Sequence, residues 1–368
     1  MEFHIVKRDH CPLWKKCCLY AGAVALALIM GGVLLMALGV DPVAYYTRMF
    51  TMGTVGNKIA YKVYINYLKD FVPLALTSVA LSLAFKMRFW NIGGEGQFIL
   101  GAIASAFVAF KAGPVLPAAL TLVLMCLAAM VVAGLYGVFV AALKVRFGTN
   151  ETLMTLMLNY VALYILTYLG ETKAEWNFFL DPESVRPVFA SFAKIVSFPS
   201  IPMGGKFTLN ICVVLTVLIG VLVYVYLKFT KHGYEIAVVG DSAGSARYAG
   251  MKVNAIVLRT VFLSAALIGL ASAFKVGTAG ILSTAITDDV GWTGIIVAWL
   301  SQLNTAVIFV VSALICVLHY GSTVAAATFS QVDSSFANML QGAILFLVLA
   351  ADFYTRFRVV IGKKGGKN

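Results

Sequence analysis

Long apolar runs dominate this chain of 368 residues and limit the folds open to it. A helix needs about 20 apolar residues to cross a bilayer core about 30 Å thick. The first run, Cys18–Val40, has that length, and similar runs recur to the C-terminus. Charged residues make up only 12% of the chain, whereas a soluble domain has about 25%. Because the runs are continuous and not alternating, an outer-membrane barrel is excluded, and we expect an all-α polytopic membrane protein.

About ten transmembrane helices are expected. They are Cys18–Val40, Phe71–Phe85, Ile92–Phe110, Ala118–Leu143, Asn150–Leu166, Thr208–Phe229, Ala255–Ala273, two spans within Gly291–Tyr320, and Phe336–Phe353. As one helix, Gly291–Tyr320 would be about 45 Å long, which exceeds the bilayer core. The polar residues Ser301, Gln302, Asn304 and Thr305 interrupt it, so we predict a break there.

Basic residues between the apolar runs indicate orientation. The net charge of +12 lies in short loops, which points to membrane topology and not to nucleic acid. With the N-terminus inside, 18 of the 28 Lys and Arg residues lie on the inner side and 10 on the outer side. Both termini are therefore expected to be cytoplasmic. The predicted regions are an N-terminal arm (1–17), a transmembrane domain (18–355) with outer loops at 41–70 and 170–207 and a cytoplasmic segment at 230–254, and a basic tail (356–368).

A polar interruption, FWNIGGEGQFILGA, lies at residues 89–102. It combines three glycines with Asn91, Glu95 and Gln97. Glycine allows the backbone to leave the helical conformation, and polar side chains can hydrogen-bond to the backbone groups that are then unpaired. The pattern therefore predicts a broken or newly starting helix at membrane depth. A charged group there costs about 2.5–3.5 kcal/mol, so Glu95 is expected to face protein or water. The alternative is a polar cap at the membrane surface.

A second polar group opens the predicted span NETLMTLMLNYVALYIL. Asn150 or Thr149 can cap this helix, and Glu151 stands in its first turn, where the helix dipole favours an anion. Glu151, Thr155 and Asn159 fall on one face of the helix. This face is either a polar stripe that lines a pathway or a capped helix with one buried amide.

The segment KHGYEIAVVGDSAGSARYAGMKVN follows the sixth span and is too polar to cross the membrane. Asp241 or Ser242 can cap a short helix that stops at Gly250. Such a helix must lie at the inner surface, with Arg247 exposed, either on lipid headgroups or in a groove of a partner protein.

Three classes of function are compatible with a polytopic chain: a transport subunit, an intramembrane enzyme and an assembly subunit. An enzyme would need a nucleophile–base pair or a metal constellation. The sequence has no H-E-x-x-H or D-D-x-x-D pattern, its four histidines lack metal-ligand spacing, and no metal site is expected. Gly205-Lys206 and Gly362-Lys363 lack the Ser or Thr of a phosphate loop. The polar groups at membrane depth favour the transport subunit.

Three stretches together resemble a known family. WNIGGEGQ (Trp90–Gln97), NETLMTLMLNYVALY (Asn150–Tyr164) and GYEIAVVGDSAGSARYAGM (Gly233–Met251) are similar to signature stretches in permease subunits of bacterial ABC importers. The group is the ribose and branched-chain amino acid type, and within it the nucleoside permeases. The resemblance runs from about Pro73 to Asp352 and implies a type II ABC importer-like fold. One departure is Ile296–Asn304, where the family more often keeps small residues.

The resemblance implies a multi-pass subunit of the bacterial cell membrane that carries a nucleoside, with a purine favoured; ribose or another simple sugar is the alternative. It also implies three kinds of partner: a second permease, with a paralogue favoured, two ATPase subunits that bind ATP and Mg²⁺, and an extracytoplasmic binding lipoprotein. The chain itself is expected to hold no cofactor and to be no enzyme. We assign the substrate pathway to Asn91, Glu95, Gln97, Glu151, Thr155 and Asn159, and the resemblance assigns ATPase coupling to Gly233, Asp241, Ser242, Arg247, Tyr248 and Gly250.

The charge asymmetry generates a first testable prediction. Single cysteines at Ser184 and Ser242, in a background without the six native cysteines, are expected to lie on opposite sides of the membrane. An impermeant thiol reagent added to intact cells should label the cysteine at 184 and not the one at 242. External labelling at 242 would contradict the predicted orientation.

Overall fold

The computed structural model of the chain describes residues 2–7, 12–192, 196–329, 331–333 and 335–362. Among these residues, nine helices have the length and apolar composition to cross a membrane. A shorter apolar helix, α11 (Val290–Leu300), accompanies them. The predicted polytopic helical fold is confirmed, and so is the predicted break, because α11 ends at Leu300 and α12 (Thr305–Ala326) begins five residues later.

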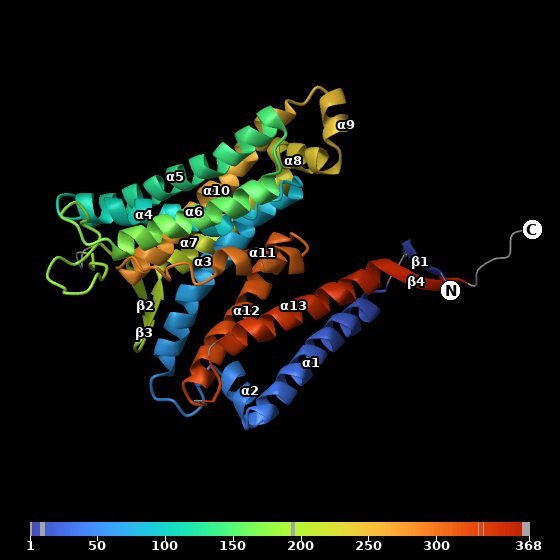
Figure 1. Cartoon of the computed structure of the whole chain (residues 1–368), viewed down its shortest axis with the longest axis horizontal. Helices are drawn as coiled ribbons and strands as arrows, with labels where there is room; N and C mark the ends of the chain where they lie inside the picture. The colour runs from blue at the N-terminus through green and yellow to red at the C-terminus, as the bar shows by residue number, and fades with distance from the viewer. Residues whose placement is uncertain (1, 8–11, 193–195, 330, 334, 363–368) are drawn as a thin grey trace, which may run out of the picture. The chain divides into compact units, whose positions relative to one another are not determined.

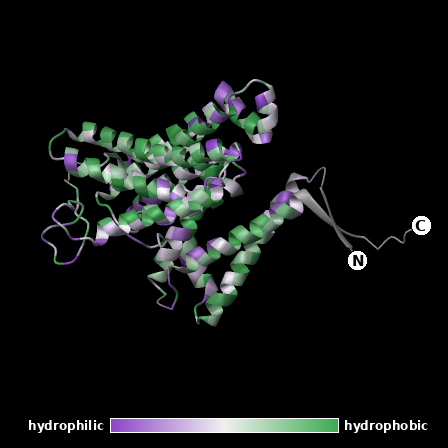
Figure 2. Ribbon diagram, turned by 45° about the horizontal axis from the view of Figure 1, so that its top comes forward, coloured by the Kyte–Doolittle hydropathy of each residue, from purple (hydrophilic) through white to green (hydrophobic). Residues whose placement is uncertain are grey.

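The chain divides into two compact units, of which the larger is Tyr61–Leu314. Its helices run beside one another in Figure 1, and Figure 2 shows that apolar residues predominate along them. In chain order the elements of this unit are α3 (Ala60–Lys86), α4 (Gly94–Ala112), α5 (Ala118–Phe147), α6 (Glu151–Glu171), β2 (Ser200–Gly204), β3 (Phe207–Asn210), α7 (Ile211–Phe229), α8 (Lys231–Asp241), α9 (Ala243–Tyr248), α10 (Val253–Ala279), α11 and the first half of α12.

Helices α4, α5 and α10 form the centre of the larger unit and approach one another through small residues. A Cβ atom at Gly269 in α10 would lie 2.2 Å from the carbonyl oxygen of Ala129 in α5. A Cβ atom at Gly137 in α5 would lie 2.6 Å from the Cβ of Ala265, and one at Gly101 in α4 would lie 2.8 Å from the Cα of Gly269. Without a hydrophobic driving force between helices in lipid, such close backbone packing is what holds them together.

Helix α3 is the most buried of the spans, and every residue of Val72–Phe85 is buried. It begins at Ala60, eleven residues before the predicted start at Phe71, so Pro73 lies inside the helix and not near its start. A tertiary contact explains the extension: the Tyr67 hydroxyl donates to the carbonyl oxygen of Ala313 at 3.0 Å. The stretch 41–70, predicted as a loop, is therefore largely helical, since it also holds α2 (Pro42–Phe50).

The stretch 170–207, predicted as a loop, is mostly irregular but includes most of the hairpin β2–β3. Gly204 (φ 120°) and Gly205 (φ 59°) make the turn, and both angles favour glycine. The following span starts at Ile211 and not at Thr208, because the Asn210 side chain caps α7 by accepting from the amide of Cys212 at 2.8 Å.

The smaller unit comprises Met1–Ala60 and Ile315–Asn368. Helix α1 (Leu13–Ala37) packs against α13 (Ser335–Arg356), and α2 contacts the second half of α12. The hydroxyls of Tyr45 and Ser322 are 2.6 Å apart. The strands β1 (Glu2–Lys7) and β4 (Phe357–Gly362) pair antiparallel, which adds two strands to a fold expected to be entirely helical.

The contact at Gly269 generates a second prediction. Gly269→Ala places a methyl group against the α5 backbone, where nothing flexible can move aside. Overpacking of this kind costs about 1–3 kcal/mol. The variant should give less monodisperse protein and a lower Tm in detergent.

Gly22→Ala in α1 is the matched control, since its added Cβ would meet nothing within 4 Å. Equal Tm values for the two variants would contradict the close approach of α5 and α10.

Candidate functional site

The chain breaks between α3 and α4, and two side chains of α6 satisfy the backbone of the break. The Asn159 Oδ1 accepts from the Gly96 amide at 2.8 Å, and its Nδ2 donates to the Ile92 carbonyl oxygen at 2.9 Å. The Thr155 hydroxyl oxygen accepts from the Ile92 amide at 3.2 Å. Asn159 thus gives partners to the Gly96 amide and the Ile92 carbonyl, and Thr155 is a second acceptor for the Ile92 amide, which also donates to the Trp90 carbonyl at 3.1 Å.

Asn91 and Gln97 close the break from within. Each amide nitrogen donates to the other's oxygen at 3.1 Å, and the Asn91 oxygen also accepts from the Gly93 amide at 3.1 Å. Both side chains are buried. Their amide groups are therefore paired within the chain.

Glu95 connects the start of α4 to the start of α11. Its Oε2 accepts from the Gly291 amide at 2.8 Å. Among the described residues, the side chain of the N-cap residue Asp289 makes no capping hydrogen bond. Glu95 therefore acts as an N-cap supplied by another helix, at a position where the helix dipole favours an anion.

Glu151 lies at the other end of the same face of α6. The predicted N-cap is confirmed, because the Asn150 side chain accepts from the amides of Thr152 (3.0 Å) and Leu153 (3.2 Å). Glu151 is mostly buried and forms an ion pair with Lys144 at the end of α5. This pair fixes the α5–α6 connection, one helical turn from Thr155.

The structure thus brings five of the six predicted pathway residues, Asn91, Glu95, Gln97, Thr155 and Asn159, together at the break, and it places Glu151 beside them in an ion pair. All six are buried and bonded within the chain.

Sequence reasoning missed the partners of this network on α11. Gly291 lies so close that a Cβ atom there would be 2.3 Å from the Glu95 amide nitrogen. It also missed Trp299, which lies in the stretch Ile296–Asn304 that departs from the family pattern. Its ring stacks on Trp90 with centroids 5.2 Å apart and planes at 12°, and both indoles are partly exposed. No local pattern pairs residues so far apart in sequence.

The segment 230–254 forms two helices, where a single short helix was expected. The hydroxyl of Thr230 accepts from the Gly233 amide at 3.2 Å and caps α8. Asp241 ends α8 and does not cap α9; the predicted alternative, Ser242, does so by accepting from the Ser245 amide at 3.2 Å. The glycines of α8 hid this helix from sequence reasoning because glycine is a poor helix former.

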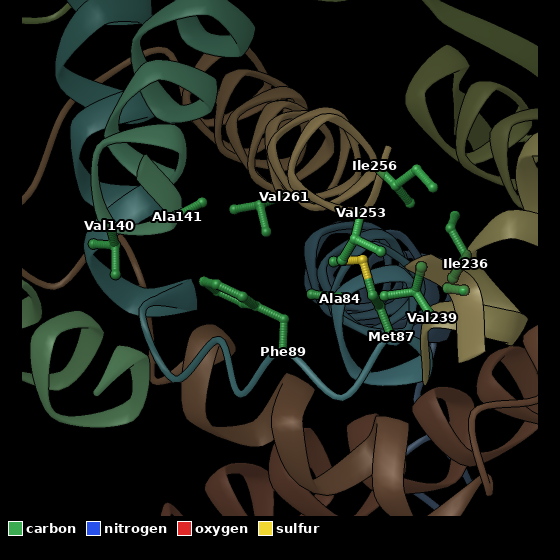
Figure 3. Packing of buried hydrophobic residues seen from close by; sticks show 11 residues of the cluster. Ala84, Met87, Phe89, Val140, Ala141, Ile236, Val239, Val253, Ile256 and Val261 are labelled. Carbon is green, nitrogen blue, oxygen red and sulfur yellow. The ribbon is translucent and has the colours of Figure 1, made fainter. Parts of the chain in front are cut away.

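Helix α8 packs directly on the residues that lead into the break (Figure 3). Ile236 belongs to one buried cluster with Met87 and Phe89. A Cβ atom at Gly240 would lie 2.1 Å from the Lys86 carbonyl oxygen, so the α8 and α3 backbones touch. Helix α8 therefore contacts the chain just before Asn91.

Residues of this segment and of α10 form a groove of about 830 Å³, which lies between α8, the turn after α9 and the start of α10. Arg259 donates to Glu235 at 2.9 Å and lies 2.7 Å from the His232 Nδ1. Arg259, and after it His232, hold the pKa of Glu235 below its usual range, so the pair persists to more acidic pH than an ordinary glutamate would allow. Arg247 and Tyr248 at the end of α9 are exposed, Tyr248 to 97%.

Residues 63–349 match the family described as the branched-chain amino acid transport system / permease component. The chain belongs to this family. Similar proteins include the glucose ABC transporter permease protein TsgB13 of Haloferax volcanii, 29% identical over 98% of this chain and 94% of that protein. The guanosine ABC transporter permease protein NupP of Bacillus subtilis is 28% identical over 94% of this chain and 96% of that protein. The nucleoside ABC transporter permease protein NupB of Lactococcus lactis is 24% identical over 89% of this chain and 88% of that protein.

The protein is therefore a permease subunit of an ABC transporter and a multi-pass protein of the cell membrane. Membership of this family implies association with ATPase and binding-protein partners. The matched residues include the break between α3 and α4, the helix α6 that bonds to it, and the helices α8 and α9.

The network at the break generates a third prediction. Asn159→Leu leaves a buried N–H and a buried carbonyl without partners, at about 1–3 kcal/mol each. Thr155→Val removes one acceptor at nearly constant shape and should cost less. Both variants are expected to lower the Tm of the permease in that order and to slow transport.

Thr152→Val is the control, because Thr152 lies on the same helix with its side chain outside the network. If Asn159→Leu were as stable as Thr152→Val, the amide would not support the break.

Proposed function

We propose that the permease forms, with a second permease that is a paralogue, the pathway for ATP-driven import of a nucleoside, preferably a purine nucleoside. An extracytoplasmic lipoprotein delivers the cargo, and two partner ATPase subunits bind ATP and Mg²⁺ and hydrolyse the ATP. Two of the similar proteins are named for guanosine and nucleoside transport, which supports this cargo. The relative named for glucose supports a simple sugar as the second candidate.

One observation carries the mechanism: the contact of α8 with the end of α3. Gly240 touches the Lys86 carbonyl, and the linker that starts at Met87 reaches Asn91 within four residues. A partner that pushes on α8 and α9 moves this linker and hence the start of α4. ATP hydrolysis by the partner ATPase subunits on the cytoplasmic side is thereby transmitted to the start of α4, and no nucleotide binds to the permease itself.

The coupling contacts are assigned to Gly233, Asp241, Ser242, Arg247, Tyr248 and Gly250. Arg247 and Tyr248 are exposed and suit a groove on the ATPase, whereas Gly233 is buried and allows α8 to turn back on α7. An exposed Arg at a protein interface offers charge and planar hydrogen bonding to a partner carboxylate.

The pathway residues are Asn91, Glu95, Gln97, Glu151, Thr155 and Asn159. We propose that they shape the pathway by holding the break, because the bonds described above occupy their polar groups within the chain. Cargo affinity then comes from the lipoprotein, and the pathway releases the nucleoside readily.

A fourth prediction tests this function. The purified complex with both permeases and ATPases, in liposomes with the lipoprotein, should take up guanosine in an ATP-dependent manner faster than ribose or glucose. Arg247→Glu reverses a charge at the proposed interface and should reduce cargo-stimulated ATP hydrolysis about tenfold, with cargo binding by the lipoprotein unchanged.

Arg146→Glu makes the same charge change on another exposed residue of the predicted inner side and is the control. Uptake of sugar without nucleoside would replace the cargo by the second candidate. Normal stimulated hydrolysis in Arg247→Glu would remove Arg247 from the coupling contact.

A further inference from the structure

A second polar cavity lies at the ends of α3 and α7, outside the groove between α8 and α10. It encloses about 420 Å³ and is lined by the side chains of Lys86, Tyr224, Lys228, Gln302, Asn304 and Thr305, among others. Lys86 is the last residue of α3 and Lys228 stands in the last turn of α7. Both helices are membrane spans, so the cavity lies where the bilayer core gives way to headgroups.

The cavity is strongly cationic. Its two ammonium groups lie outside ion-pair distance of every carboxylate in the described part of the chain, and the Lys228 ammonium donates to the Tyr224 hydroxyl at 3.0 Å. Thr305 also begins α12, a helix of 22 residues, so the positive end of its dipole reaches the same cavity. Two uncompensated lysines beside a helix N-terminus suit an anion with several acceptor oxygens.

Helix α7 indicates which anion. Between the cavity and the other end of α7, large apolar side chains are exposed: Val214, Val217, Leu218, Val221, Leu222 and Val225. An acyl chain can lie along this face while its headgroup occupies the cavity. A free phosphate would use the lysines alone.

We propose that this Lys86–Lys228 cavity binds the phosphate-bearing headgroup of an anionic phospholipid, with the acyl chains along α7. Basic pockets between transmembrane helices suit such headgroups. The cavity wall includes the turn between α11 and α12, where Gln302 (φ 49°) and Leu303 (φ 58°) hold left-handed angles that are costly outside glycine. A headgroup bound there stabilises the turn that separates α11 from α12.

The test uses the full-length permease purified in a neutral detergent. Short-chain phosphatidylglycerol and phosphatidylcholine are titrated separately, and binding is measured by native mass spectrometry and by the shift in Tm. Phosphatidylglycerol should bind more tightly than phosphatidylcholine. In Lys86→Gln/Lys228→Gln its apparent Kd should rise about 30-fold, and in each single variant about fivefold.

Lys58→Gln/Lys62→Gln removes the same charge from two exposed lysines outside this cavity and should leave the Kd unchanged. If the control weakened phosphatidylglycerol binding equally, the effect would come from net charge alone, and the proposed site would be wrong. Full displacement of the lipid by millimolar inorganic phosphate would assign the cavity to free phosphate instead. Equal affinity for the two lipids would also overturn the proposal. The single variants keep the test decisive if the double variant fails to fold.

Discussion

The rest of the structure depends on one constraint: every backbone N–H and carbonyl at membrane depth needs a partner inside the protein. The chain violates helical continuity between α3 and α4, and the violation is tolerated because Asn159 and Thr155 from α6 supply the missing partners. Asn91 and Gln97 then satisfy each other. Apart from Glu95, the side chains at the break are amides and hydroxyls, which keep their hydrogen-bonding capacity at any physiological pH.

Small residues make this arrangement reachable. Gly137 and Gly269 bring α5 and α10 into close contact, and Gly101 lets α4 lie against α10. With larger residues the three helices would stand farther apart, and Gln97, which packs against Gly137, would face a void. Close helix packing and hydrogen bonding at the break therefore depend on each other. The Asn91–Gln97 pair and the bonds from Asn159 and Thr155 require the short distances between the helices.

Properties that are local in sequence could be predicted, and those that join distant segments could not. The apolar runs located the spans, the polar residues from Ser301 to Thr305 located the break before α12, and Asn150 identified the start of α6. The early start of α3 was missed because it depends on the contact of Tyr67 with Ala313. The partner of Glu95 was missed for the same reason, since Gly291 lies 196 residues away. Helix α8 was missed because its glycines serve a close approach that no propensity scale includes.

The bond between Glu95 and Gly291 has a consequence for biosynthesis. Helix α11 has 11 residues, about half of what crosses a bilayer, and its cap belongs to a helix made much earlier. Until the ribosome reaches Gly291, 196 positions after Glu95, the Glu95 side chain is without the amide that it later binds. The α4 end must stay hydrated or shielded throughout that interval, and α11 can settle only when α4 is already in place. One side chain thus links an early and a late stage of synthesis, because a chain truncated before α11 lacks the Gly291 amide that donates to Glu95.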